Sequence, residues 1–172
     1  MFMAHAPVGY ITSRLLARYC VDTPTQYRWF IACGMLGAIA PDIDWIWYLQ
    51  VAHRQGDHHE YFTHLPVTWI SALLLTGLWA SLDKVRGMRA ISFCLGGLMH
   101  MVLDTVVGGI HWFAPFDDRT VVWFQPSPDF LALWWFYFLF HWSFKLELFL
   151  TAMAFLYWLK PVRQHKRIHT PL

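Results

Sequence analysis

Long apolar segments separated by short polar connections dominate the chain. The segment Leu65–Leu82 contains 18 residues and no charge, and Met88–Val107 and Phe144–Leu159 are apolar over similar lengths. About 20 consecutive apolar residues are needed for a helix to cross a bilayer. These three segments therefore predict membrane-embedded helices.

The remaining apolar segments are shorter. Ala6–Tyr19 has a helical pattern, and Trp29–Ala40 stops at Pro41, which disfavours helix for the residue before it. Trp45–Val51 follows, and the aromatic stretch Leu131–Trp142 predicts a separate interfacial or buried helix. The fold class expected is all-α: a polytopic membrane bundle of about 4–5 embedded helices, forming a single domain over residues 1–172.

The composition agrees with this class. The chain is 57% hydrophobic and only 14% charged, with a mean hydropathy of +0.36, values typical of integral membrane proteins. A net charge of +2 and the lack of a long basic run argue against a nucleic-acid partner.

Lysine and arginine concentrate around two short connections and in the C-terminal tail, and this placement predicts how the chain is oriented in the membrane. Cytoplasmic connections of membrane proteins are enriched in these residues. Arg14, Arg18 and Arg28 surround the first connection. The second connection contains Lys84, Arg86 and Arg89, and the tail contains Lys160, Arg163, Lys166 and Arg167. We therefore expect these regions and the C-terminus to be cytoplasmic, and residues 50–64 and 108–143 to lie on the other side.

His100 and Asp104 interrupt the apolar segment Met88–Val107. At positions i and i+4 of a helix their side chains share one face, close enough to bind one ion. An aspartate within the bilayer costs about 2.5–3.5 kcal/mol on insertion scales, and a bound metal would offset that cost. The alternative is a buried hydrogen-bonded pair that holds helices together.

Other potential ligands fall at the same, non-cytoplasmic ends of the predicted helices. They are His5, Asp42, Asp44, His58, His59, His64, His111, His141 and Glu147. Imidazole and carboxylate ligands together suit zinc, and also manganese or iron. For three of these residues a simpler role stays open: Asp42 as a helix cap, and His58 and His59 as ordinary loop residues. His141 beside Trp142 has an equally simple alternative as an interfacial histidine.

Five short motifs follow one another along the chain: Met3–Gly9, Pro41–Asp44, His59–His64, His100–Asp104 and Pro115-Phe116. In this order they resemble the YdjM-like family of inner-membrane, metal-dependent hydrolases. That family is in turn similar to the zinc-dependent phospholipases C and to single-strand nucleases. The resemblance implies a location in the bacterial inner membrane and a divalent metal cofactor, Zn²⁺ before Mn²⁺ or Fe²⁺, with one to three ions bound.

The resemblance also implies roles for individual residues. The metal ligands expected are His5, Asp42, Asp44, His59, His64, His100, Asp104 and His111, with Asp104 bridging. Apart from the resemblance, we expect whichever of Asp42 and Asp44 is not fully committed to metal to act as general base. The implied reaction is hydrolysis of a phosphoester in a membrane lipid or lipid-linked substrate. Two alternatives stay open: a metal-ion or proton carrier or sensor, because intramembrane His/Asp chains also build ion pathways, and a scaffold without catalytic activity.

Overall fold

The computed structural model describes residues 1, 3–51, 58–124, 139 and 141–161. Within these residues it contains six α-helices and no β-strand, which confirms the all-α class. The helices are α1 (His5–Cys20), α2 (Pro24–Ile39), α3 (Asp44–Gln50), α4 (Pro66–Leu82), α5 (Lys84–Asp104) and α8 (Trp142–Leu159). Three 3₁₀ turns, η1 (Pro41–Ile43), η2 (His58–Glu60) and η3 (Phe62–His64), connect α2 to α4 through α3.

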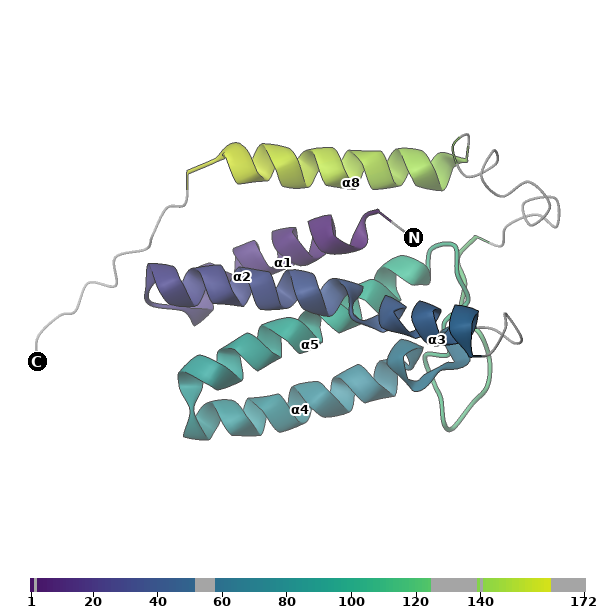
Figure 1. Ribbon diagram of the computed structural model, residues 1–172, viewed down its shortest axis with the longest axis horizontal. Helices are drawn as coiled ribbons and strands as arrows, with labels where there is room; N and C mark the ends of the chain where they lie inside the picture. The colour runs from purple at the N-terminus through teal and green to yellow at the C-terminus, as the bar shows by residue number, and fades with distance from the viewer. Residues whose placement is uncertain (2, 52–57, 125–138, 140, 162–172) are drawn as a thin grey trace, which may run out of the picture.

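The five long helices lie alongside one another (Figure 1). The central helix α5 packs against α1, α2 and α4, while α8 packs on α1. The start of α1, the end of α2, the start of α4 and the end of α5 all meet at one end of the bundle (Figure 1). The short helix α3 lies at this end as well. We call this end of the bundle the site end.

The helix bounds agree with the predicted segments except at α2 and α5. The prediction that Lys84, Arg86 and Arg89 lie in a connection is wrong, because α5 already begins at Lys84. Asp83 caps this helix by accepting a hydrogen bond from the backbone N–H of Arg86 at 3.0 Å. The basic residues therefore form the first two turns of α5, where long charged side chains are good helix formers. At its other end α5 stops at Asp104 instead of Val107.

Helix α2 starts earlier than its apolar pattern indicates. Thr23 caps it by accepting a hydrogen bond from the N–H of Gln26 at 3.2 Å, and Pro24 occupies the first turn, where its missing N–H costs nothing. The predicted stop before Pro41 is confirmed. Most of the predicted helix at Leu131–Trp142 lies outside the described residues.

No single helix among the described residues combines the length and the apolar composition needed to cross a membrane. Helix α2 and the stretch Pro41–Gln50 satisfy both requirements together, as a pair bent by 51°.

Glycines let the central helices approach closely. A Cβ atom on Gly96 would lie 2.3 Å from the carbonyl oxygen of Gly34, and one on Gly97 would lie 2.2 Å from the Trp69 ring. Both positions therefore require glycine, because real Cβ contacts are longer than 3.0 Å. The close contact of α5 with α2 brings the last turns of both helices, and the residues after them, to the site end.

Candidate metal centre

Four side chains from three separate segments meet at the site end. Asp42 comes from η1, His64 from η3, and His100 and Asp104 from the last turns of α5. Each offers one ligand atom, and the four atoms all lie within 4.8 Å of one another. The stop at Pro41 turns the chain after α2 and so places Asp42 opposite α5.

The distances between these atoms suit a tetrahedral ion. His100 Nε2 lies 3.3 Å from His64 Nε2, 3.0 Å from Asp104 Oδ2 and 3.5 Å from Asp42 Oδ1. His64 Nε2 lies 3.9 Å from Asp42 Oδ1 and 3.8 Å from Asp104 Oδ2. Ligands at the corners of a tetrahedron with zinc bond lengths of 2.0–2.1 Å stand about 3.3 Å apart. The four atoms can therefore close around one ion with small movements.

Hydrogen bonds at the far ring nitrogens direct both histidines toward this point. His100 Nδ1 donates to the carbonyl oxygen of Ala38 at 2.8 Å, so the lone pair of Nε2 is directed toward the other three ligand atoms. His64 Nδ1 lies 2.6 Å from Asp44 Oδ2, and the Thr63 hydroxyl donates to the same oxygen. Such outer partners fix the tautomer and ring orientation of metal-binding histidines. Asp44 lies behind His64, so it contacts the centre through this histidine.

Asp42 and Asp104 present their second oxygens to His5. Its Nε2 lies 3.1 Å from Asp104 Oδ1, and its Nδ1 lies 3.8 Å from Asp42 Oδ2. The His5 ring stacks on the His100 ring with centroids 3.8 Å apart, and its Nδ1 is buried without a hydrogen-bond partner. The amino group of Met1 also lies 2.5 Å from Asp104 Oδ1. Both carboxylates are thus placed to bridge two positions, one between His64 and His100 and one beside His5.

Among the described residues around the centre, exposure is uneven. The side chains of His5, His64, His100 and Asp104 are at most 4% exposed, whereas Asp42 is 31% and His59 is 16% exposed. His59 Nε2 lies 3.8 Å from Asp104 Oδ2. Asp42 and His59 are therefore the more accessible side chains of this group. Asp42 does not act as a helix cap, because the cap positions of η1 and α3 are Ala40 and Ile43, and neither helix start has a side-chain cap.

A loop after α5 carries His111. The loop is fixed by a bridge between Ile110 and Val121 and by the Trp112 indole, which donates to the Thr105 hydroxyl at 2.7 Å. His111 Nδ1 donates to the carbonyl of Asp118 at 3.0 Å, and the four-residue group does not include this histidine. Its role as a ligand stays a prediction.

The same loop contains a local ion pair. Arg119 donates from its side chain and its backbone to Asp117, and these hydrogen bonds hold the pKa of the Asp117 carboxyl below its usual value.

The sequence left two polar residues undecided, Glu147 within α8 and His141 just before it. The Glu147 carboxylate is fully buried and accepts a hydrogen bond from the backbone N–H of Met3. His141 caps α8, since its Nδ1 accepts the N–H of Ser143 at 3.3 Å and lies 2.8 Å from the Ser143 hydroxyl. No spacing signal could have linked Glu147 to Met3, because the two residues are 144 positions apart.

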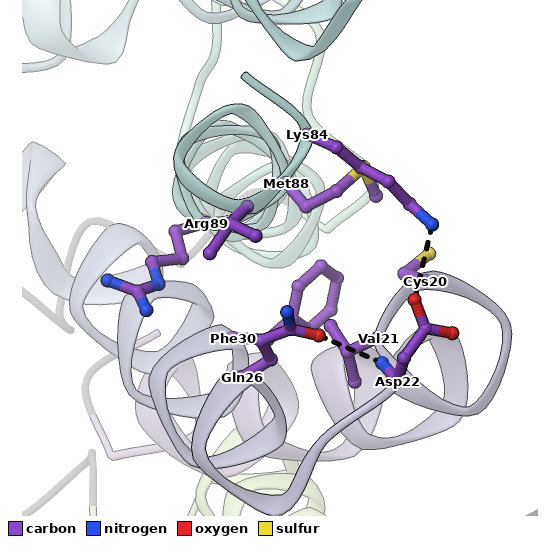
Figure 2. Close-up of a pocket in the computed structure, with 9 residues that line it drawn as sticks. Cys20, Val21, Asp22, Gln26, Phe30, Lys84, Met88 and Arg89 are labelled. Carbon is purple, nitrogen blue, oxygen red and sulfur yellow. Dashed lines mark hydrogen bonds and ion pairs between the residues drawn. The ribbon is translucent and has the colours of Figure 1, made fainter.

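A pocket at the opposite end of the bundle has a different chemistry (Figure 2). It lies where α1 ends and where α2 and α5 begin, and Asp22, Gln26, Lys84 and Arg89 contribute its polar lining. Lys84 Nζ pairs with Asp22 Oδ2 at 3.3 Å, and the N–H of Asp22 donates to the Gln26 side chain. Histidines are absent from its lining and its one carboxylate is paired with lysine, so this pocket does not resemble a metal site.

Comparison with known proteins supports the predicted family. The sequence model described as YdjM inner membrane protein matches residues 1–167, which is nearly the whole chain. No curated protein and no solved structure matched the chain.

Proposed function

Because the chain belongs to the YdjM family of inner membrane proteins, we propose that it is a membrane-embedded, metal-dependent hydrolase. Its substrate is a phosphoester in a lipid or in a lipid-linked molecule. The observation that carries this proposal is the buried Asp42, His64, His100 and Asp104 group, whose ligand atoms are spaced for one divalent ion.

The distribution of side chains supports embedding in the bilayer. On α4, Leu74, Leu75 and Leu78 are 67–69% exposed, whereas on α8 the polar residues Ser143 and Glu147 are buried. A soluble monomer rarely exposes large contiguous apolar patches. A surface of this kind is expected where the surrounding solvent is hydrocarbon.

The two ends of the bundle support an orientation. Lys84, Arg86 and Arg89 lie at the end opposite the metal centre, in the first turns of α5. Because lysine and arginine concentrate on the cytoplasmic side of membrane proteins, this end is cytoplasmic in our proposal. The metal centre then faces the non-cytoplasmic side.

The donor set fits zinc. Two imidazole nitrogens and two carboxylate oxygens form a ligand combination typical of Zn²⁺, and His5 with the second oxygens of Asp42 and Asp104 offers a place for another ion. A divalent ion bound here would lower the pKa of water and would polarise the phosphoryl oxygen. The metal identity and the number of ions belong to the proposal.

In the proposed reaction the oxygen of water forms a bond to phosphorus, and the bond from phosphorus to the ester oxygen breaks. Asp42 is the most exposed of the four ligands, so with one ion bound its other carboxylate oxygen can accept the proton that water loses. The leaving alcohol takes up a proton from the solvent side. Asp104 and the two histidines, which are buried, hold the ligand geometry.

Metal analysis of detergent-purified protein tests the first step. We expect at least one tightly bound zinc per chain in the wild type and its loss in His100→Ala and Asp104→Asn. Asp22→Asn is the matched control, because Asp22 pairs with Lys84 at the other end of the bundle. A wild type that binds no metal stoichiometrically contradicts the proposal.

Activity is tested separately, on phospholipid and generic phosphodiester substrates in mixed micelles. We expect metal-dependent release of phosphate monoester by the wild type and none by Asp104→Asn. Uptake of metal ions into protein-containing liposomes, without hydrolysis of any phosphoester substrate, would instead support the ion-carrier function.

A further inference from the structure

Glu147 carries a buried carboxylate on a helix, α8, that is otherwise mostly apolar. Helix α8 contains two charged residues, of which Lys145 is exposed and Glu147 is 0% exposed. Burying a carboxylate is costly unless hydrogen bonds compensate. A glutamate in this place therefore needs hydrogen-bond donors that offset the free-energy cost of its burial.

One partner that the structure shows is the N-terminal segment Met3–His5. Glu147 Oε2 accepts the backbone N–H of Met3, two residues before His5, which is the first residue of α1. Ala4, between them, is fully buried, and its carbonyl accepts the N–H of Val8 at 2.9 Å. The segment is thus held by α8 on one side and reaches Asp104 through His5 on the other.

We propose that Glu147 is a positioning residue of the metal centre, acting through His5. By fixing the N–H of Met3 it sets where α1 begins and hence where the His5 ring lies against His100 and Asp104. The inference rests on the proposed function, since it concerns metal binding at that centre. It adds α8, which contributes none of the four ligands, to the machinery of the site.

The role predicts a definite order of variants. Glu147→Gln keeps a carbonyl oxygen at the same reach, so it can still accept the Met3 N–H. Glu147→Asp keeps the charge but withdraws it by one methylene, and Glu147→Ala removes the acceptor. A positioning role predicts that Gln retains metal binding better than Asp, whereas a role that depends on charge alone predicts the reverse.

The experiment measures the zinc affinity of the purified full-length protein by competition with a chelator, with melting temperatures recorded in parallel. We expect Glu147→Ala and Glu147→Asp to bind zinc about 10-fold more weakly, the lower end of the loss for a residue bonded directly to a ligand, because Glu147 acts through Met3 and His5. Glu147→Gln should stay close to wild type, and Lys145→Gln, on the exposed side of the same helix, should not change.

A second measurement separates positioning from general damage to the fold. In a His5→Ala background, Glu147→Ala should cause no additional loss of zinc affinity, because the residue through which it acts is gone. The visible spectrum of the cobalt-loaded protein should change in Glu147→Ala in the same direction as in His5→Ala.

Three results would overturn the inference while leaving the proposed function intact. They are wild-type affinity in Glu147→Ala, an equal loss with and without His5, and retention of binding by Asp but not by Gln. If Glu147→Ala does not fold, the order of Gln and Asp still decides. A wild type that binds no zinc defeats the proposed function itself, and the inference with it.

Discussion

Asp42 and Asp44, two residues apart in one turn, face different partners. Asp42 Oδ1 lies 3.5 Å from His100 Nε2 and belongs to the ligand group, whereas Asp44 Oδ2 contacts His64 Nδ1 at 2.6 Å. The sequence motif Pro41–Asp44 predicted both as ligands and did not distinguish them. The distinction arises because η1 turns between the two side chains, so that one faces α5 and the other faces η3.

Replacing each aspartate by asparagine should therefore have unequal effects on zinc affinity. Asp44→Asn can keep a hydrogen bond to His64, so we expect a loss of about 10–100-fold, as for other outer partners of metal ligands. Asp42→Asn removes a ligand charge and should reduce the affinity further, which chelator competition will show. Equal affinities in the two variants would contradict the assignment of Asp44 to an outer position.

The candidate site was predictable where it depends on local spacing. His100 and Asp104 are one helical turn apart, so their approach to 3.0 Å follows from the helix itself. The hydrogen bond from His100 to the Ala38 carbonyl and the stacking of His5 on His100 were not predictable, because both depend on how α1, α2 and α5 pack.

Among the helices, the contact of α2 with α5 is the least tolerant. A Cβ on Gly96 would lie 2.3 Å from the Gly34 carbonyl oxygen and 2.6 Å from the Ala38 nitrogen, both backbone atoms that cannot rotate away. We expect Gly96→Ala to destabilise the protein by about 3 kcal/mol, the upper end of typical overpacking costs. Because Ala38 holds His100, zinc affinity should fall as well.

Gly77→Ala is the matched control for this change. No atom lies within 4 Å of a Cβ built on Gly77 of α4, so alanine should be neutral or stabilise the helix by up to about 1 kcal/mol. Thermal unfolding in detergent measures both variants. A melting temperature of Gly96→Ala equal to that of Gly77→Ala would show that the two helices separate more easily than their contacts indicate.

Arg14 links α1 to the C-terminal end of α8, the end that is far from Glu147. It is buried in α1, and its guanidinium donates to the carbonyls of Tyr157 and Lys160 in the last turn of α8 and just beyond it. A cation at a helix C-terminus also interacts favourably with the helix dipole. We expect Arg14→Met to destabilise the protein by about 2–4 kcal/mol, corresponding to one or two charge-assisted hydrogen bonds.

Arg18→Met serves as the control for Arg14→Met, because Arg18 lies one turn later on α1 and is exposed. Its melting temperature should match that of the wild type. If both variants melt together, the contacts of Arg14 with α8 do not contribute to stability.

The helices themselves were largely predictable, and the errors have a common cause. Apolar runs located α1, α4 and α8 to within two residues, because periodicity and proline stops are local. The same criterion excluded Lys84, Arg86 and Arg89 from α5, although charged residues are compatible with helix when their side chains reach solvent. Apolar length thus detected the buried part of this helix and not its first turns.

At the scale of the whole molecule, two highly exposed residues mark opposite ends of the bundle. Phe116, 92% exposed, lies in the loop after α5 at the site end, and Leu82, 88% exposed, ends α4 at the other. In the proposed orientation the first faces away from the cytoplasm and the second faces it. Cysteine placed at either position would report its side of the membrane.

The experiment uses a variant in which Cys20, Cys33 and Cys94 are replaced by serine. Phe116→Cys should react with a membrane-impermeant maleimide in intact spheroplasts, whereas Leu82→Cys should react only after the membrane is permeabilised. Labelling of both after solubilisation in detergent shows that each thiol is reactive. The opposite pattern would place the metal centre on the cytoplasmic side, and a substrate would then have to come from the inner leaflet.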